Sequence, residues 1–208
     1  MTPYDPQKHH RRSIRLKGYN YAQPGAYFIT LVTHRRDTIF GQIIQKEMQL
    51  SALGRIVHEE WMRSISLRRE ICLNADEFVI MPNHLHGIVW IIHPVGADGV
   101  RPIAPPNDEE GARRAPQPEA PQPGVPQPRL NRLPRSLSSF VAGFKSSVTG
   151  RAGRELGISG IWQRNYYDHI IRNEREFKRI WNYIDTNPQR WQEDQLHPAA
   201  PPNSFNQG

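Results

Sequence analysis

The hydrophobic residues of this chain follow two spacings, one typical of strands and the other typical of helices. Continuous β-branched and aromatic runs bounded by turn residues predict buried strands. The first run follows a Pro24-Gly25 turn, and two later runs are joined by the turn pair Pro82-Asn83, which predicts an antiparallel hairpin. The predicted strands are residues 26–33, 77–81, 84–92 and 166–171, with a short hairpin at residues 42–50.

Three segments instead repeat apolar residues every three or four positions, which is the spacing of an amphipathic helix. The N-cap residues that precede them are Ser51, Ser136 and Asn173. Glu176 should complete a capping box with Asn173, and Pro188 should end the last helix at Asn187. The apolar positions are Leu53, Ile56, Val57 and Trp61 in the first helix; Leu137, Phe140, Val141, Phe144 and Val148 in the second; and Phe177, Ile180, Trp181 and Ile184 in the third.

The order of these elements indicates the fold class. A strand, a hairpin, a helix, two strands, a helix, a strand and a helix follow one another along the chain. Short hairpin connections make neighbouring strands antiparallel, and the interspersed helices are typical of α+β proteins. We therefore predict an α+β domain with a mainly antiparallel sheet.

The distribution of proline along the sequence predicts which parts of the chain fold. Eleven of the 19 prolines fall between Pro94 and Pro134, a stretch that holds no aromatic residue. Such a segment buries too little apolar surface to offset the entropy lost on ordering, so we expect a disordered linker. The expected organisation is a basic N-terminal arm at residues 1–18, a first half of the domain at 19–93, a disordered Pro-rich insertion at 94–130, a second half at 131–192 and a disordered tail at 193–208.

The charge of the chain favours a polyanionic partner such as nucleic acid. Among 208 residues, 27 basic and 20 acidic side chains give a net charge of +7 and a pI near 9.8. No acid lies between Asp5 and Asp37, and the basic cluster in this stretch is either a solvated tail or an arm that tracks phosphates. Lys145, on the outward face of the second helix, is a further candidate for DNA binding. The basic cluster consists of Lys8, Arg11, Arg12, Arg15 and Lys17.

The single cysteine and the short apolar runs limit the cellular setting. Cys72 cannot form an intrachain disulfide, which excludes a secreted disulfide scaffold. The longest apolar run, residues 88–92, is far shorter than the ~20 residues that span a bilayer, and the first residues do not resemble a signal peptide. We therefore expect a cytoplasmic protein without a membrane partner.

The tripeptide His84-Leu85-His86 is the strongest local signal for chemistry. Residues i and i+2 of a strand point to the same face, so the two imidazoles would stand side by side while Leu85 packs into the core. Two neighbouring neutral imidazoles form a divalent-metal pair that lacks only a third ligand. The alternative is two partly exposed histidines on a sheet edge, and the spacing alone leaves both interpretations open.

Tyr183 and Asn187 form a second pair, spaced i, i+4 on the last predicted helix. This spacing places both on one flank of the apolar stripe, where a side chain is held by packing and still reaches a cleft. A phenol with its usual pKa near 10 needs a polarised electrophile or a nearby base before it acts as a nucleophile. Periodicity alone favours an ordinary boundary tyrosine and a helix-ending asparagine.

Three motifs taken together resemble the REP-associated tyrosine transposases, members of the single-tyrosine HUH transposase superfamily. They are Met81-Pro-Asn-His-Leu-His-Gly-Ile-Val, Ile161-Trp-Gln-Arg-Asn-Tyr-Tyr-Asp-His-Ile-Ile-Arg and Tyr183-Ile-Asp-Thr-Asn-Pro, in that order. The resemblance covers residues 19–93 and 131–192. It implies a ferredoxin-like antiparallel sheet with helices on one face, interrupted by the Pro-rich linker.

The same resemblance implies the residues of an active site. The two metal-binding histidines of the family correspond to His84 and His86, which would hold Mg²⁺ or Mn²⁺. Its nucleophilic tyrosine corresponds to Tyr183. Asn187 stands where the family places a third metal ligand.

The reaction that the resemblance implies is cleavage of single-stranded DNA near palindromic hairpins. It would pass through a covalent 5′-phosphotyrosine intermediate, and the protein would act as a monomer or homodimer. Tyr166 and Tyr167 are rival nucleophiles by composition. They precede the last helix and lack an amide four residues later, so they rank below Tyr183.

Two other interpretations remain open at this point. In the first, the protein is a DNA-binding module of the same fold that no longer cleaves. In the second, His84 and His86 belong to a zinc-dependent hydrolase, with Asp168 or His169 as the third ligand. A reaction that prefers Zn²⁺ and does not depend on a tyrosine would favour the hydrolase.

Overall fold

The computed structural model describes residues 19–92 and 135–201. The predicted arm at residues 1–18, with its five basic side chains, and the Pro-rich insertion at 94–130 lie outside the described residues. Within the two described ranges, no helix has the length and apolar character needed to cross a membrane.

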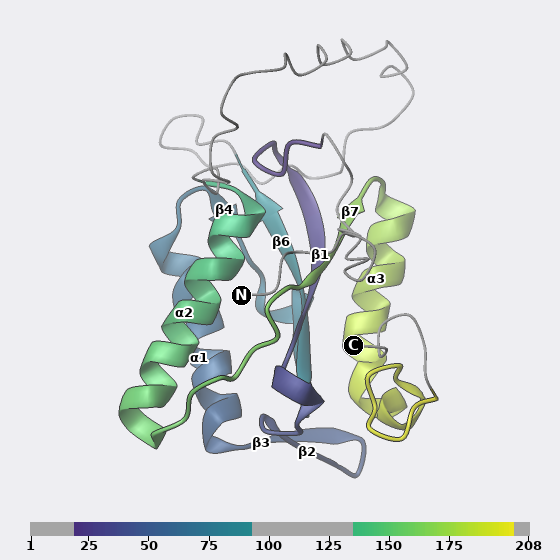
Figure 1. Cartoon of the computed structure of the whole chain (residues 1–208). Coiled ribbons are helices and arrows are strands. Elements are labelled where there is room, and N and C mark those ends of the chain that lie inside the picture. Colours follow the sequence, from purple (N-terminus) through teal and green to yellow (C-terminus); the bar gives the residue numbers. More distant parts are fainter. Residues whose placement is uncertain (1–18, 93–134, 202–208) are drawn as a thin grey trace, which may run out of the picture.

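A five-stranded antiparallel sheet forms the centre of the fold (Figure 1). Its strands are β1 (Gly25–Val32), β4 (Ile71–Cys72), β5 (Phe78–Met81), β6 (His84–Ile91) and β7 (Tyr167–Ile171). They pair in the order β4-β6-β1-β7, and β5 pairs with the His84 end of β6 while β4 pairs with its other end. β1 and β6 lie side by side along their full length, because the register joins Val32 to His84 and Gly25 to Ile91.

Three α-helices begin at the predicted caps. They are α1 (Ala52–Leu67), α2 (Leu137–Leu156) and α3 (Glu174–Thr186). Ser51 and Ser136 accept backbone hydrogen bonds at the starts of α1 and α2, and Asn173 does so for α3. The expected capping box of α3 is not formed, because the Glu176 carboxylate accepts from the Arg172 N–H instead of the Asn173 N–H.

The remaining elements are short. A separate two-stranded sheet confirms the predicted hairpin, and three 3-10 segments connect the larger elements. The periodic pattern does not predict β4 or the 3-10 segments, because so few residues cannot display a period. These elements are β2 (Gly41–Ile44), β3 (Glu47–Leu50), η1 (His34–Arg36), η2 (Ala75–Glu77) and η3 (Asn187–Glu193).

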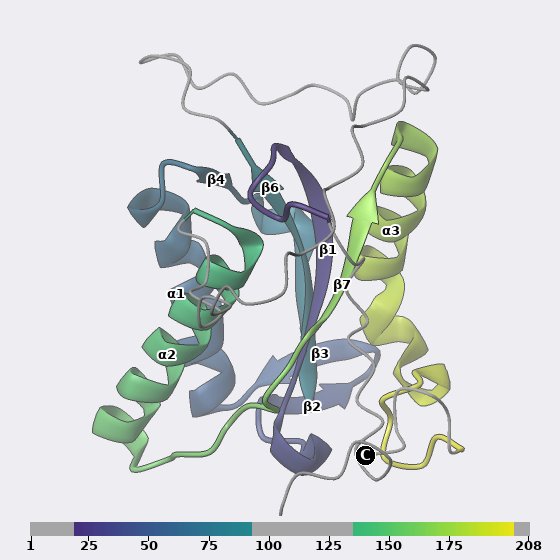
Figure 2. The same cartoon turned by 45° about the horizontal axis from the view of Figure 1, so that its top comes forward.

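Different helices cover the two faces of the sheet (Figures 1 and 2). α1 and α2 pack on one face, whereas α3 packs on the other, where Ile180 and Ile184 belong to one hydrophobic cluster with side chains of β1 and β6. The α+β class and the antiparallel sheet are confirmed, and the element order is ferredoxin-like. The expectation of helices on one face holds for α1 and α2 and is wrong for α3. All eight residues of β6 are buried, so both faces need cover.

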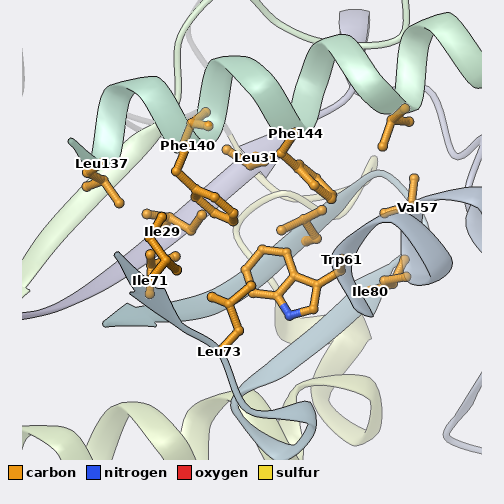
Figure 3. Close-up of a cluster of buried hydrophobic side chains, with 14 of the residues drawn as sticks. Ile29, Leu31, Val57, Trp61, Ile71, Leu73, Ile80, Leu137, Phe140 and Phe144 are labelled. Atoms are coloured by element: carbon orange, nitrogen blue, oxygen red, sulfur yellow. The ribbon is translucent and has the colours of Figure 1, made fainter. Parts of the chain in front are cut away.

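Trp61 of α1 lies at the centre of the larger core cluster (Figure 3). Its ring is fully buried and stacks on Phe78, with 4.4 Å between the ring centroids. Phe140 and Phe144 of α2 meet the same ring edge-on at 5.7 and 5.5 Å. Gly87 of β6 makes this packing possible, because a Cβ at that position would lie 2.5 Å from Trp61 Cη2. The missing side chain therefore lets α1 approach the strand that carries both histidines.

The segment that follows α3 folds back against the sheet. Trp191 and Leu196 are buried, and Asn83 Nδ2 donates to the Leu196 carbonyl at 2.7 Å. The expectation of a disordered tail is therefore wrong for residues 193–201, while residues 202–208 lie outside the described residues. Two apolar side chains and a buried hydrogen bond from the Asn83 side chain to the backbone hold this segment against the β5–β6 turn.

Candidate active site

β1 and β6 direct alternate side chains toward the α3 face of the sheet. Thr30 pairs with His86 and Val32 pairs with His84, and both histidines are buried, at 3% and 0% exposure. Leu85 lies between them and joins the core cluster on the opposite face. The predicted same-face pair is confirmed. The alternative of exposed histidines at a sheet edge is wrong, because β6 has strand partners on both sides.

The two imidazoles face each other through their Nε2 atoms, which lie 3.0 Å apart. Each Nδ1 atom has its own partner 2.8 Å away: Asn83 Oδ1 for His84 and Thr30 Oγ1 for His86. Burial lowers the pKa of His86 to about 3. Burial, with the neighbouring His86, also lowers the pKa of His84 well below its usual value. Both rings are therefore neutral at neutral pH, the state in which imidazole binds metal ions.

Asp194 brings a carboxylate to the same place. Its Oδ2 lies 3.8 Å from His84 Nε2, and its side chain is only 5% exposed. One ligand atom from each of His84, His86 and Asp194 lies within 4.8 Å of the others. Burial raises the pKa of Asp194, while hydrogen bonds from the Leu196 N–H and from Asn187 oppose that rise. Sequence reasoning misses Asp194, because it assigns residues 193–208 to a disordered tail.

Asn187, the predicted third ligand, lies beside this cluster at the end of α3. It is 3% exposed, and its amide hydrogen-bonds to Tyr183 and Asp194 and holds down the pKa of each. Among the described residues, its buried Oδ1 has no hydrogen-bond partner. A buried amide oxygen without a partner is costly, and a cation would satisfy it. Two neutral imidazoles and the Asp194 carboxylate fit a divalent metal ion, and Asn187 lies next to this set.

Tyr183 reaches the histidines from α3. Its Oη lies 3.1 Å from His86 Nε2, and its ring meets Phe28 edge-on at 6.1 Å between centroids. The side chain is 40% exposed, so it borders both the buried site and solvent, as the predicted flank position requires. Burial, followed by the negative charge of Asp194, raises the pKa of Tyr183 to about 12. At neutral pH the phenol is protonated, so its use as a nucleophile requires activation.

A cleft of about 690 Å³ opens beside Tyr183. His86, Asn187 and Asp194 line it, and so do both rival tyrosines, Tyr166 and Tyr167. Tyr167 contacts Phe28 at 6.4 Å between ring centroids, and Tyr183 forms a hydrogen bond with His86. The other polar and charged lining residues are Thr30, Gln163, Asn165, Arg179, Arg190, Glu193 and Gln195.

The third ligands expected for a zinc hydrolase lie elsewhere. Asp168 pairs with Ile29 on β1, and strand alternation places both on the α1–α2 face, away from His84. His169 shares the α3 face, but its Nε2 lies 2.7 Å from a carboxylate oxygen of Glu176. Neither residue joins the histidine pair, and the structure supplies Asp194 in their place.

The position of Lys145 on the predicted helix suggests that its side chain points outward to solvent, but in the structure it does not. Its ammonium donates to the carbonyl oxygens of Gln163 and Asn165, both at 2.8 Å, and lies 5.7 Å from the Trp162 ring centroid. Burial lowers the pKa of Lys145 to about 8. Its long stem carries the charge to the loop that follows α2, where two carbonyls bind it.

Comparison with known proteins relates this chain to a protein of similar sequence and to a solved structure of similar fold. No model of a known protein family matches the chain. A protein of Haemophilus influenzae described as uncharacterized is 42% identical over 196 residues, which span 94% of this chain and 98% of the relative. This chain belongs to the same family as the Haemophilus influenzae protein.

The fold neighbour is a solved structure described as "Structure of the REP associates tyrosine transposase bound to a REP hairpin". It shares 18% sequence identity with this chain at a TM-score of 0.50, and the match covers 85% of this chain and 73% of the other. At this identity the likeness shows a shared fold. It agrees with the ferredoxin-like arrangement of β1, α1, β6, α2 and β7.

Proposed function

We propose that this protein is a metal-dependent, transposase-type endonuclease that cleaves single-stranded DNA near hairpins and becomes covalently linked to it through Tyr183. The observation that carries the proposal is the 3.1 Å approach of Tyr183 Oη to His86 Nε2, at the edge of the His84–His86–Asp194 cluster. The fold neighbour, a tyrosine transposase bound to a REP hairpin, supports the choice of DNA as substrate. The net charge of +7 supports it independently.

The chemistry follows from the state of each group. Tyr183 Oη attacks the scissile phosphorus, the bond from phosphorus to the 3′-oxygen breaks, and the DNA end keeps a 5′-phosphate esterified to the tyrosine. The phenol proton leaves to solvent and the departing 3′-oxygen gains a proton, so atoms and charge balance. Because one phosphate ester replaces another, the step is reversible without a nucleotide cofactor.

Three sets of side chains prepare the attack: the Asn187 amide, the metal-binding cluster and the arginines of the cleft. Asn187 donates to Tyr183 and lowers its pKa against the opposing effects of burial and of Asp194. His84, His86 and Asp194 would hold Mg²⁺ or Mn²⁺, with the Asn187 oxygen as a further ligand. When bound there, such a cation polarises the phosphate and stabilises the leaving oxygen. The cleft beside Tyr183 also presents cationic side chains that complement a phosphate backbone, Arg179 and Arg190.

The test is covalent capture of labelled DNA by the full-length protein. The substrate is a single-stranded oligonucleotide carrying a palindromic repeat from the flanks of the coding region, labelled at its 3′ end in one sample and at its 5′ end in another. With Mg²⁺ or Mn²⁺, only the 3′ label should migrate with the protein in a denaturing gel, because the tyrosine retains the 5′-phosphate. Tyr183→Phe should abolish the adduct while binding persists.

Tyr167→Phe is the matched control for this experiment. It removes one hydroxyl from the same cleft and leaves the hydrogen bond between Tyr183 and His86 intact. Adducts that persist in Tyr183→Phe and vanish in Tyr167→Phe would reverse the assignment. Specific DNA binding with no adduct in any metal would favour the module that binds without cleaving.

The zinc hydrolase stays as a second candidate function, because His84, His86 and Asp194 supply the three protein ligands of a catalytic zinc site. The two candidates differ in their dependence on Tyr183. A hydrolase reaction would prefer Zn²⁺ and would survive Tyr183→Phe, whereas the proposed cleavage would require the hydroxyl. Measuring both variants with Mg²⁺, Mn²⁺ and Zn²⁺ separates them.

A further inference from the structure

Asn83 is a fully buried amide in the two-residue turn between β5 and β6. From the sequence it is an ordinary turn residue. Its backbone is fixed by Thr33, whose N–H and hydroxyl both donate to the Asn83 carbonyl at 2.9 Å. The side chain is consequently held in one place, directly beside His84.

The hydrogen bonds of this amide determine its orientation. Nδ2 donates to the carbonyl oxygens of Arg36, at 3.2 Å, and Leu196, at 2.7 Å. Both amide hydrogens are therefore used, and Oδ1 is the atom that faces His84 Nδ1 at 2.8 Å. An amide oxygen only accepts hydrogen bonds, so the proton of the neutral His84 ring must sit on Nδ1. His84 Nε2 then carries the lone pair, and it faces His86 and Asp194.

The second histidine has no amide partner of this kind; its Nε2 lies 3.0 Å from the bare Nε2 of His84, so in the metal-free protein the hydrogen bond between the two rings requires the proton of His86 to sit on Nε2. The Nδ1 atom of His86 lies 2.8 Å from the Thr30 hydroxyl, and a hydroxyl serves as either donor or acceptor. Thr30 therefore fits both neutral forms of His86. Only for His84 does an amide side chain determine which ring nitrogen carries the proton, because the Nδ2 hydrogens of Asn83 are both used by backbone carbonyls.

We propose that Asn83 is a positioning residue for the metal site that the proposed function requires. It sets the proton of His84 on Nδ1, which leaves Nε2 free to bind a cation. Through its bond to the Leu196 carbonyl it also fixes the segment that carries Asp194, two residues earlier. One side chain thus positions a ligand on β6 and a ligand on the chain that follows η3. Partners of this kind typically change metal affinity by about 10–100-fold when removed.

The first test needs no variant. Long-range ¹H–¹⁵N correlation spectra of the metal-free, full-length protein report which nitrogen of each histidine is protonated. We expect His84 to be protonated at Nδ1 and bare at Nε2. A His84 ring protonated at Nε2 would overturn the proposal, whether or not the protein binds a metal ion.

The second test compares Asn83→Leu, which keeps a similar volume and removes every polar group, with Asn83→Asp, which keeps an acceptor for His84. Mn²⁺ binding is measured by titration calorimetry. Asn83→Leu should bind Mn²⁺ about 10–100-fold more weakly and lose the single protonated form of His84. Asn83→Asp should keep the Nδ1 proton and bind Mn²⁺ more tightly than Asn83→Leu.

Asn74→Leu is the control, since it removes a turn amide that donates to Glu77 at 2.6 Å, away from the histidines. It should leave Mn²⁺ affinity unchanged. A folded Asn83→Leu protein with wild-type affinity, or an Asn83→Asp protein no better than Asn83→Leu, would overturn the role of Asn83. A wild-type protein that binds no Mn²⁺ would contradict the proposed function instead, while the spectra would still decide the role of Asn83.

Discussion

Replacing Gly87 by alanine tests whether the core dictates the position of the histidine strand. A Cβ at this position would lie 2.5 Å from Trp61 Cη2 and 2.7 Å from Cζ2, well inside van der Waals separation. The Trp61 ring cannot move aside easily, because it is fully buried and stacks on Phe78. Two α2 aromatics, Phe140 and Phe144, meet it edge-on (Figure 3). Overpacking of a rigid core costs about 1–3 kcal/mol.

The expected destabilisation is measurable by thermal and urea unfolding followed by circular dichroism. For a domain of this size, about 2 kcal/mol corresponds to a fall in Tm of about 4–8 °C. Gly87 adjoins His86, so the displaced strand should also weaken Mn²⁺ binding. Gly150→Ala is the control: a Cβ at this α2 position would lie 3.5 Å from Arg154 Nη1, an ordinary separation, and alanine there should raise the free energy of unfolding by about 0.5–1 kcal/mol.

A double-mutant cycle decides whether the clash with Trp61 is the cause. Trp61→Phe removes the two ring atoms that the new methyl group would meet, so Gly87→Ala should cost less than about 0.5 kcal/mol in that background. Mn²⁺ affinity should recover in the same double variant. An equal cost in both backgrounds, or a neutral effect in the wild type, would refute the reasoning.

Three further predictions concern charge. Asp194→Asn should weaken Mn²⁺ binding and stabilise the metal-free protein at pH 7. Burial raises the pKa of Asp194 in the folded state, so the free energy of unfolding of the wild type falls as pH rises through that pKa. The difference in stability between wild type and variant should vanish in acid, where the carboxyl is protonated in both the folded and the unfolded state. Lys145→Met should lower the free energy of unfolding by about 1–3 kcal/mol because it removes two charged hydrogen bonds, and should leave the salt dependence of DNA binding unchanged; a flatter salt slope would instead place Lys145 on a phosphate. Deleting residues 1–17 should weaken the binding of hairpin and non-hairpin DNA alike. It should also flatten the slope of log affinity against log salt by up to about 0.7 for each phosphate that the arm binds in the intact protein. Weaker binding confined to one DNA sequence would contradict this prediction.

Local patterns predict most of the fold and half of the site. Strand alternation alone places His84 and His86 on one face with Leu85 on the other, because that relation depends only on the pleat. Helical spacing likewise places Tyr183 and Asn187 on one flank of α3. Each of these relations joins residues within four positions of one another.

The remaining features depend on interactions between distant segments. Asp194 lies 110 residues after His84 in the sequence. No local pattern near Asp194 predicts that Trp191 and Leu196 pack this segment against the β5–β6 turn. The continuous apolar run of β6 indicates that both of its faces are buried, but it does not specify which helix packs on each face. That α3 covers the second face therefore could not be predicted from the strand alone. The long side chain of Lys145 reaches a loop 18 residues away, so its Cβ direction says little about its ammonium.

The most direct test of the central claim is to identify the residue that carries DNA. The full-length protein is incubated with Mn²⁺ and a hairpin oligonucleotide, the covalent complex is digested with protease and nuclease, and the modified peptide is sequenced by mass spectrometry. We predict one nucleotide-bearing peptide, modified at Tyr183. A nucleotide on Tyr166 or Tyr167, or DNA cleavage with no protein-linked nucleotide, would contradict the proposed mechanism.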